Sequence, residues 1–440
     1  MNANTTITHT QGETQLMARF ETVREELAGS VSVDALRSAA AAQLRQAGLP
    51  HRRVEEYKYS DLRAFMKSAA PLATPSAAPD IEAALSALDS YGDLERHRIV
   101  IANGSYRAEF SDAAALAEDG VTVADFSAAL TADDGAQLLA TPRTAGQDGL
   151  LALNTAFVQG GVVVDVRAGT TVSKPIEIVH VATSEGAQVT RCRIAVGEGA
   201  GLRLLETFTG DMGSGELNAV FDYAVGDRAK LASTRLIAGA AAGPRLLTTI
   251  ATIGADAEFK SLGFIAGPGF ARNQQFVNFT GEHSDAKIYG VSMARGTSLA
   301  DQTLIVDHAV PHCNSREYFK TVLDDSARGV YQGRINVAPH AQKTDGEMMT
   351  QALLLSEEAE MANKPELEIF ADDVVCAHGA TSGQIDEELL FYLRARGIPE
   401  DEAQTLLIMA FLSEAIEEFD EEDVTEVLEA RVRDWLAVKN

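Results

Sequence analysis

Cysteine is scarce in this sequence: its 440 residues include three, at Cys192, Cys313 and Cys376. They are odd in number and far apart, and no C-x-x-C pair occurs. This pattern excludes a disulfide framework and a structural zinc site of the usual kind. It also excludes an iron–sulfur cluster held by four thiolates of this chain alone.

Positive charge is also in short supply, since 37 Lys and Arg face 64 Asp and Glu, for a net charge of −27. A nucleic-acid surface needs concentrated Lys and Arg, so a nucleic-acid partner is not expected. No apolar run is long enough to span a bilayer, and the first 15 residues lack the basic and apolar regions of a secretory signal. We therefore expect a cytoplasmic protein without a membrane partner.

Nucleotide-binding motifs are missing. No G-x-x-x-x-G-K-[ST] sequence occurs, and Gly197, Gly199 and Gly201 fall between expected strands rather than before a helix. If ATP drives the function, a partner must hydrolyse it. Aromatic residues make up 6% of the chain and include one Trp, which argues against the sugar-stacking platforms of a carbohydrate-active enzyme.

Three regions differ in their patterns. Residues 1–95 carry helical periodicity, clearest from Gln15 to Gly48, and predict an N-terminal helical domain. Residues 96–375 are predicted to form a β core, in which Asn103-Gly104 is a hairpin-turn signal. Residues 376–440 are predicted to form a C-terminal helical domain, with helices at 389–395, 402–419 and 424–438.

The β core contains a loose internal repeat from about residue 160. Its copies have an apolar residue, a glycine and one or two polar residues; they begin at Val196, Val225, Ile253 and Thr280, which are 29, 28 and 27 residues apart. Near-constant spacing without intervening helices predicts β units that stack on their neighbours. A β-sandwich would not normally keep such a repeat, so a β-solenoid is favoured.

The segment from Lys364 to Gly397 carries the strongest candidate site. It is predicted to change from strand to helix, and Cys376 and His378 lie at that joint. Alternate residues of a strand share a face, so this thiol and imidazole can point at one small target. The competing interpretations are a structural histidine at a strand end and a small buried cysteine.

Other chemical groups are weaker candidates. His308 and His312-Cys313 have metal-like spacing, but Pro311 breaks the helix that would align them, so a structural or surface role is expected. Adjacent acids such as Asp372-Asp373 point to opposite faces of a strand and do not suit a two-carboxylate hydrolase. The acidic run from Glu417 to Asp423 is interpreted as a solvated face, with a partner-facing surface as the alternative.

Several motifs together resemble the SufB/SufD family of iron–sulfur cluster assembly proteins, and within it the SufD branch. The matching residues are Lys364-Pro365-Glu366-Leu367-Glu368-Ile369, Asp372-Asp373-Val374, Cys376-Ala377-His378-Gly379-Ala380-Thr381, Phe391-Tyr392-Leu393-Arg394-Ala395-Arg396-Gly397-Ile398, Gly333-Arg334-Ile335, Ala341-Gln342-Lys343-Thr344-Asp345-Gly346 and Leu353-Leu354-Leu355-Ser356. Weaker matches occur at Glu56-Tyr57-Lys58-Tyr59-Ser60-Asp61 and Asn103-Gly104. The resemblance covers most of the chain. Gly379 separates it from SufB, which carries glutamate at this position.

The resemblance implies a right-handed parallel β-helix flanked by helical domains, and a non-ATPase scaffold rather than an enzyme. By this resemblance the chain would pair with a SufB-like paralogue, and His378 would face that partner's cysteine at a nascent iron–sulfur cluster, with Cys376 in support. A SufC-like ABC ATPase would dock on the C-terminal helices. The docking residues would be Leu389, Phe391, Tyr392, Arg394 and Arg396. Reduced flavin on the complex is a further expectation.

Two alternatives remain open from the sequence. A carbohydrate-active β-helix enzyme would share the architecture, although it needs carboxylates on neighbouring rungs of one face. A self-associating homodimer is the other, because SufB and SufD surfaces are related. The sequence does not tell whether iron enters through this subunit, what the N-terminal helices contact, or which residues face the interior of the solenoid.

Overall fold

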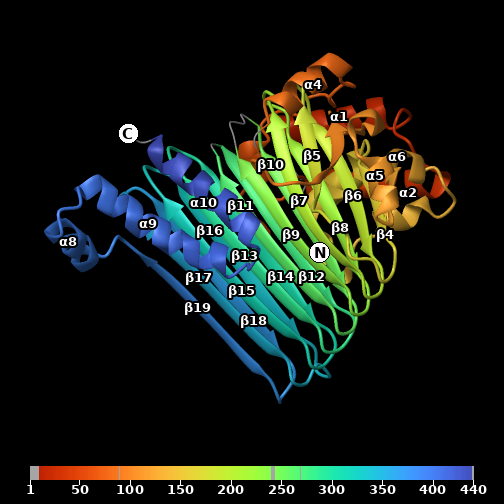
Figure 1. The fold of residues 1–440 in the computed structure, drawn as a ribbon. Helices are drawn as coiled ribbons and strands as arrows, with labels where there is room; N and C mark the ends of the chain where they lie inside the picture. Colours follow the sequence, from red (N-terminus) through yellow and green to blue (C-terminus); the bar gives the residue numbers. More distant parts are fainter. Residues whose placement is uncertain (1–8, 89, 239–242, 268, 439–440) are drawn as a thin grey trace, which may run out of the picture.

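Two parallel β-sheets stacked face to face form the body of the protein in a computed structural model, which describes residues 9–88, 90–238, 243–267 and 269–438 (Figure 1). After β4, successive strands alternate between the sheets, so each strand pairs in parallel with the strand two positions further along the chain. This is a β-solenoid, as the repeat predicted. The ten-stranded sheet has the order β19-β17-β15-β13-β11-β9-β7-β5-β1-β2, and the nine-stranded sheet has the order β18-β16-β14-β12-β10-β8-β6-β4-β3.

The strand bounds follow this alternation. The ten-stranded sheet contains β1 (His97–Ala102), β2 (Ser105–Tyr106), β5 (Ile176–Ala182), β7 (Gly201–Gly210), β9 (Lys230–Ala238), β11 (Glu258–Ala266), β13 (Asp285–Ala294), β15 (Asn314–Leu323), β17 (Asp345–Leu354) and β19 (Val375–Gly383). The nine-stranded sheet contains β3 (Val121–Asp125), β4 (Val162–Val166), β6 (Gln188–Val196), β8 (Leu217–Val225), β10 (Arg245–Ile253), β12 (Phe270–Phe279), β14 (Leu299–His308), β16 (Arg328–Val337) and β18 (Glu360–Ile369).

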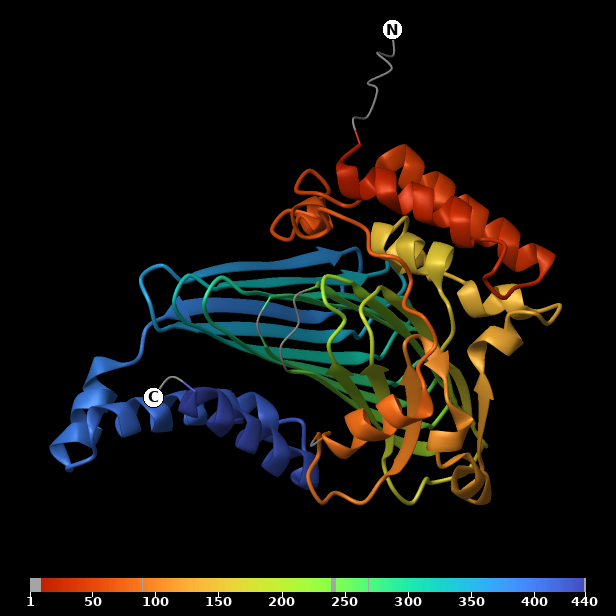
Figure 2. The ribbon, with the colours of Figure 1, turned by 90° about the horizontal axis from the view of Figure 1, so that it is seen from above.

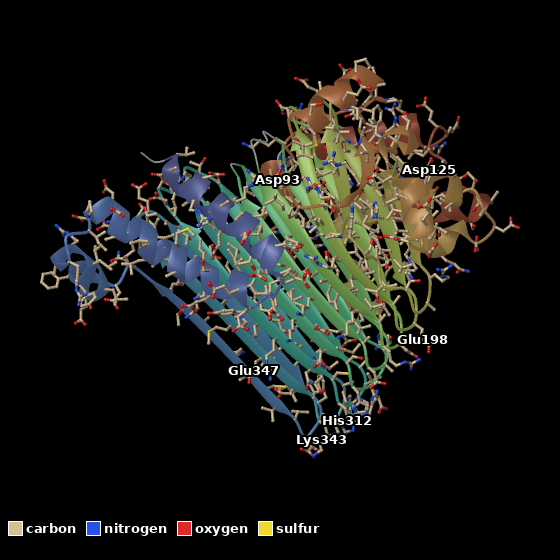
Figure 3. The ribbon with its side chains drawn as sticks, in the orientation of Figure 1. Asp93, Asp125, Glu198, His312, Lys343 and Glu347 are labelled. Atoms are coloured by element: carbon tan, nitrogen blue, oxygen red, sulfur yellow. The ribbon has the colours of Figure 1, made fainter. Side chains whose placement is uncertain are left out.

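The repeated glycine motif forms one turn edge of the solenoid. Six turns on this edge each hold one residue with positive φ, and these residues stack from coil to coil: Gly199, Arg228, Asp256, His283, His312 and Lys343. Their backbone N–H groups bond to the next turn, as Arg228 N does to Ala255 O at 2.7 Å and Lys343 N to Asp373 O at 2.7 Å. Figure 3 labels Glu198, His312 and Lys343 along this edge. The stacked turns hold the register of the strands.

Alternate residues of each strand face the space between the sheets and form the main core. This core is mostly aliphatic and aromatic, with Phe221, Phe259, Ile288 and Val306 as fully buried examples. Burial of such side chains provides the main stabilisation of a solenoid, since neighbouring coils share one continuous core.

Helices cover one end and one side of the solenoid. At the N-terminal side lie α1 (Gln11–Val23), α2 (Val31–Ala47), α3 (Leu62–Phe65), α4 (Ala78–Ser86), α5 (Ala113–Glu118), α6 (Phe126–Ala129) and α7 (Gly149–Phe157). The predicted N-terminal helices are therefore present, and Asn103-Gly104 makes the expected hairpin between β1 and β2, in which Ala102 pairs with Ser105. The helices α5 and α6 contact β3 at the first coil, and the N-terminal segment around Glu55 extends over the outer face of the nine-stranded sheet as far as β18, where Glu55 pairs with Lys364 at 2.5 Å (Figure 2).

The C-terminal helices α9 (Glu400–Glu417) and α10 (Glu422–Ala437) lie across the outer face of the ten-stranded sheet (Figures 1 and 2). Their apolar face packs on strand residues such as Leu236, Leu262 and Phe264. Two members of the acidic run fasten them further: Glu421 pairs with Arg203 at 2.8 Å, and Asp423 also contacts Arg203. Part of that run is thus bonded within the chain while remaining partly exposed to solvent. No described helix is long and apolar enough to cross a membrane.

One boundary differs from the sequence prediction. The strand expected from Lys364 to Val375 is two strands, because β18 ends at Ile369 and a turn leads into β19, which extends to Gly383. Strand therefore continues beyond residue 375, where a helical segment was expected. The next helix, α8 (Glu387–Ala395), begins two residues before the predicted start at 389, after Asp386, whose side chain accepts hydrogen bonds from Glu388 N and Leu389 N. The missed turn has no glycine or proline between Phe370 and Val374 to mark it.

A buried ion pair ties the solenoid to the N-terminal region. Arg272 on β12 bonds to Asp301 on β14 at 2.5 Å, to the Ser60 hydroxyl at 2.8 Å and to Glu56 O at 2.9 Å. Both charged side chains are about 99% or more buried. Removing one partner would leave the other charge without compensation.

We expect Asp301→Asn to lower the free energy of unfolding by about 3–5 kcal/mol, because the Arg272 guanidinium would stay buried without its carboxylate. Urea denaturation followed by circular dichroism measures this. The matched control is Glu198→Gln, which removes a carboxylate from an exposed pair with Arg228 and should change stability little. Equal effects of the two substitutions would contradict the assigned role.

Candidate functional site

Cys376 and His378 lie in the first half of β19, not at a strand–helix joint as the sequence had indicated. In the parallel register Cys376 pairs with Gly346 and His378 with Met348. Met348 belongs to the main core and Cys376 packs against it, so both β19 residues are on the core-facing side of the strand. The prediction that they share a face is therefore confirmed, at a different place in the fold.

The two residues are accessible because β19 is the last strand of its sheet. Within the described structure β19 pairs only with β17, and β18, the last strand of the other sheet, pairs only with β16. No further coil covers the core at this point. His378 is exposed and Cys376 is half-buried, whereas Cys192 and Cys313 are buried completely. We call this uncovered end of the solenoid, formed by β18 and β19, the open end.

The electrostatic surroundings of Cys376 disfavour its thiolate in the isolated chain. Burial raises the pKa of the Cys376 thiol, and the nearby carboxylates of Asp345 and Glu317 raise it further, against a lowering by the Gly346 backbone. A cation at the open end would act in the opposite direction, because it stabilises the thiolate.

Polar contacts join the two sheets at the open end. The Thr350 hydroxyl donates to Asn363 Oδ1 at 3.1 Å, and Asn363 Nδ2 donates to the Ser382 hydroxyl at 3.2 Å. Pro365 lies on β18 and has no N–H, so the free edge of that strand is interrupted. The edge of β19 contains no proline and keeps its full set of backbone donors and acceptors.

The other candidates from the sequence are not brought to this site. His308 is buried and its Nε2 bonds to the Ser315 hydroxyl at 3.0 Å; burial lowers its pKa to about 3. His312 is on the turn edge, where its ring stacks on His283 at 4.7 Å between centroids. In the part of the chain that the structure describes, no three His, Cys, Asp or Glu side chains converge to hold a metal ion.

The candidate docking residues lie apart from the open end, on α8. This helix buries none of its residues, and Leu389, Phe391 and Tyr392 are 52%, 74% and 54% exposed. Arg394 pairs with Glu400 at 3.2 Å, and the Arg396 guanidinium lies 4.6 Å from the centre of the Tyr392 ring. Figure 1 shows α8 projecting beyond the solenoid. Such an exposed aromatic and aliphatic patch is typical of an interaction surface.

Comparison with known proteins places this geometry in a family. The core domain of SufBD proteins of the SUF iron–sulfur cluster assembly system matches residues 179–411, and the SufBD N-terminal region matches residues 10–178. This chain belongs to the SufBD family. It is 31% identical over 397 residues to the iron–sulfur cluster assembly protein SufD of Escherichia coli K12, which covers 89% of this chain and 90% of the relative.

Two further relatives of the SufBD family agree with this assignment. An iron–sulfur cluster assembly SufBD family protein of Synechocystis is 25% identical over 437 residues, covering 92% of each chain. The iron–sulfur cluster assembly protein SufD of Bacillus subtilis is 26% identical over 290 residues, covering 63% of this chain and 65% of the relative. The family resemblance read from the motifs is thereby confirmed.

The motif Ala341–Gly346 has a structural explanation in this SufBD protein. Lys343, in the positive-φ position of its turn, forms an ion pair with Asp373, and Gln342 Oε1 accepts from Asp373 N at 2.8 Å. Gly346 follows beside Cys376; a Cβ there would lie 3.4 Å from the Ser315 hydroxyl. The motif thus ties its own turn to the turn that leads into β19, and Gly346 leaves the position beside Cys376 on β17 without a side chain.

Sequence reasoning missed a buried carboxylate, Glu317 on β15, which is 2% exposed. Burial raises its pKa to about 8, against a smaller lowering by Ser315 and Arg316. The Ser315 hydroxyl lies near enough to lower this pKa but is itself paired with His308 at 3.0 Å, and neither carboxylate oxygen of Glu317 has a partner in good hydrogen-bond geometry among the described residues. The signal in the sequence was only an acidic residue at a core-facing position of a strand, which cannot be recognised until the register is known.

Stability should depend on pH through Glu317. Its pKa in the folded chain lies above the ordinary value of 4.5, so the folded state binds more protons and loses stability as pH rises from 4.5 to 8. We expect Glu317→Gln to gain stability relative to the wild type over this range, by a few kcal/mol at the upper end. Urea denaturation at several pH values measures the difference.

The control for this prediction is Glu347→Gln, which changes a half-exposed carboxylate on neighbouring β17 and should show no such trend. Figure 3 labels Glu347 on that strand. Parallel stability profiles of Glu317→Gln and the wild type would show that Glu317 is not a buried ionisable group in solution.

Proposed function

We propose that this protein is the non-ATPase scaffold subunit of a SUF complex and that it pairs through the open end with a SufB-like paralogue. The observation that carries the proposal is the position of Cys376 and His378 on the core-facing side of an unpaired last strand. A partner that extends the sheets would cover the open end and bring its own side chains next to these two.

The ligand chemistry supports a shared cluster. Imidazole nitrogen and thiolate sulfur both bind iron, and clusters usually have four protein ligands. Two ligands from this chain require the remainder from elsewhere, which fits a nascent cluster held between two subunits. The cluster is cargo that is built and released, so a neutral imidazole that can dissociate suits the role better than a second thiolate.

The exposed patch on α8 supports docking of a SufC-like ABC ATPase. Leu389, Phe391 and Tyr392 would enter a pocket of that partner, and Arg394 and Arg396 would flank the contact. The partner would hydrolyse ATP, and closure of two ATPase copies would pull on the C-terminal helices and rearrange the open end. Reduced flavin on the complex stays an expectation, with no residue of this chain assigned to it.

Membership of an assembly family favours this scaffold over the carbohydrate-active alternative. A homodimer is the remaining competitor, because the open end of a second copy would present the same two free strands. The compartment proposed is the cytoplasm, where thiols stay reduced and Cys376 would remain available for iron.

The first test is anaerobic co-expression of the chain with SufB-like and SufC-like subunits, followed by size-exclusion chromatography and iron and sulfide analysis. We expect a complex that carries iron and sulfide. His378→Ala should lose most of both while the complex keeps its size, because the exposed imidazole would act as a ligand and contribute little to folding. His312→Ala, which changes an exposed histidine on the turn edge, is the control.

Wild-type iron and sulfide content in the His378→Ala complex would rule out the ligand role. A chain that elutes alone or as a homodimer in the presence of both partners would rule out the scaffold role itself.

The second test concerns α8. Phe391→Asp should weaken binding of the SufC-like subunit at least about tenfold, because a charge would enter the centre of an apolar contact. Surface plasmon resonance with the immobilised full chain measures this. Val31→Asp is the matched control, since Val31 is 88% exposed on α2 at the other end of the molecule. Unchanged affinity for Phe391→Asp would place the ATPase contact elsewhere.

A further inference from the structure

The buried carboxylate of Glu317 lies in the same interior column as His378. In the register of the ten-stranded sheet Glu317 pairs with Met348, and Met348 pairs with His378. A column of three side chains therefore leads inward from the open end: imidazole, thioether and carboxylate. Met348 is 2% exposed, so it separates the accessible histidine from the buried glutamate.

A glycine on the facing sheet leaves room between these groups. A Cβ on Gly333 would lie 2.4 Å from the Tyr331 hydroxyl and 2.6 Å from the Met348 sulfur, so the hydroxyl and the thioether meet over the bare backbone of this residue. Tyr331 is 1% exposed, and its hydroxyl has no hydrogen-bond partner among the described residues. Any larger residue at 333 would displace both groups.

Two unpartnered oxygen groups in an apolar core are costly. A buried hydroxyl or carboxylate without a hydrogen bond destabilises a protein, and native structures contain few of them. Glu317 and Tyr331 are on facing sheets in the same region of the core, since the Tyr331 ring centre lies 4.6 Å from that of Phe319, two residues along β15 from Glu317. Burial raises the pKa of the Tyr331 hydroxyl well above its usual value, and the charge of Glu317 raises it further. Polar groups buried at such a cost are candidates for binding a ligand.

We propose that Glu317, Met348 and Tyr331 form an inner site for a ferrous ion, beneath the rung of Cys376 and His378. Carboxylate and phenol oxygens are hard ligands and a thioether is a soft one, a mixture that a borderline ion such as Fe(II) accepts. A cation is the class of ligand that compensates the charge of an ionised Glu317, whereas a neutral or anionic ligand would not.

The site would bind ferrous ion with low affinity and release it readily, as is needed for iron that is passed on to a cluster. The chain offers a single carboxylate here rather than a converging set of strong ligands, so water must complete the coordination. This inference deepens the proposed function, on which it rests for the choice of iron, because an ion held here is one side chain away from His378. It gives the interior of this subunit a role in the supply of iron to the cluster.

Anaerobic titration of the isolated full-length chain with ferrous ammonium sulfate, followed by calorimetry, tests the inference. We expect the Cys376→Ser/His378→Ala double variant to keep one weak ferrous site. Adding Glu317→Gln should weaken that site at least about tenfold. Glu347→Gln on the outer face of β17 is the matched control and should leave the site unchanged.

Met348→Leu provides a second variant, because it keeps the volume of the side chain and removes only the sulfur. It should weaken ferrous binding while manganous binding, which depends on oxygen ligands, changes less. Circular dichroism verifies that each variant is folded. The inference is overturned if the double variant binds no ferrous ion, or if the isotherms with and without Glu317→Gln coincide.

The titration of the isolated chain and the co-expression experiment test the inner site and the scaffold role separately. Failure of the inner site would leave the iron and sulfide content of the co-expressed complex unaffected by Glu317→Gln. Failure of the scaffold role would appear as a missing complex, whether or not the isolated chain binds ferrous ion.

Discussion

Backbone hydrogen bonding between parallel coils is the constraint on which the rest of this structure depends. Each strand is satisfied by the coils before and after it, so a solenoid can grow without limit unless something ends it. At the N-terminal end β2 and β3 run antiparallel to their neighbours and the helical region covers them. At the other end no described strand pairs with the free edges of β18 and β19, although Glu55 contacts Lys364 on the outer face of β18. The first coil of the solenoid is therefore capped, whereas the last coil leaves the backbone edges of β18 and β19 unpaired among the described residues.

Free strand edges, such as those at the open end, promote aggregation, and most proteins protect them with a proline, a charge or a covering segment. Here the two edges are treated differently: Pro365 interrupts β18, whereas β19 keeps all its backbone donors and acceptors. The intact edge is also the one that carries Cys376 and His378. Selective pairing through β19 would therefore bring a partner to these side chains first, and the same hydrogen bonds that complete the fold would assemble the site.

The local pattern in the sequence predicted the solenoid well and the site only partly. Glycine turns at near-constant spacing and the Asn103-Gly104 hairpin are local signals, and each was found where the sequence indicated. The turn between β18 and β19 has no glycine or proline, and its turn-favouring pair Asp372-Asp373 was not interpreted as a turn, so the strand containing Cys376 was misplaced. Glu317 could not be found at all, because its importance comes from non-local facts: the register with Met348 and His378, and the bare backbone of Gly333 across the core.

Glu317 also shows how stability and function oppose each other in this fold. A glutamine at this position would be easier to bury, and an apolar residue would fill the core without any polar group to satisfy. Solenoids tolerate such a local defect better than small domains do, because each coil is supported by its neighbours over a long continuous core. The destabilisation caused by burying Glu317 lies near the open end, where an interface with the proposed partner would add stabilising contacts. A bound proton offsets this destabilisation at pH values below about 8, and the proposed ferrous ion would offset it when the carboxylate is ionised.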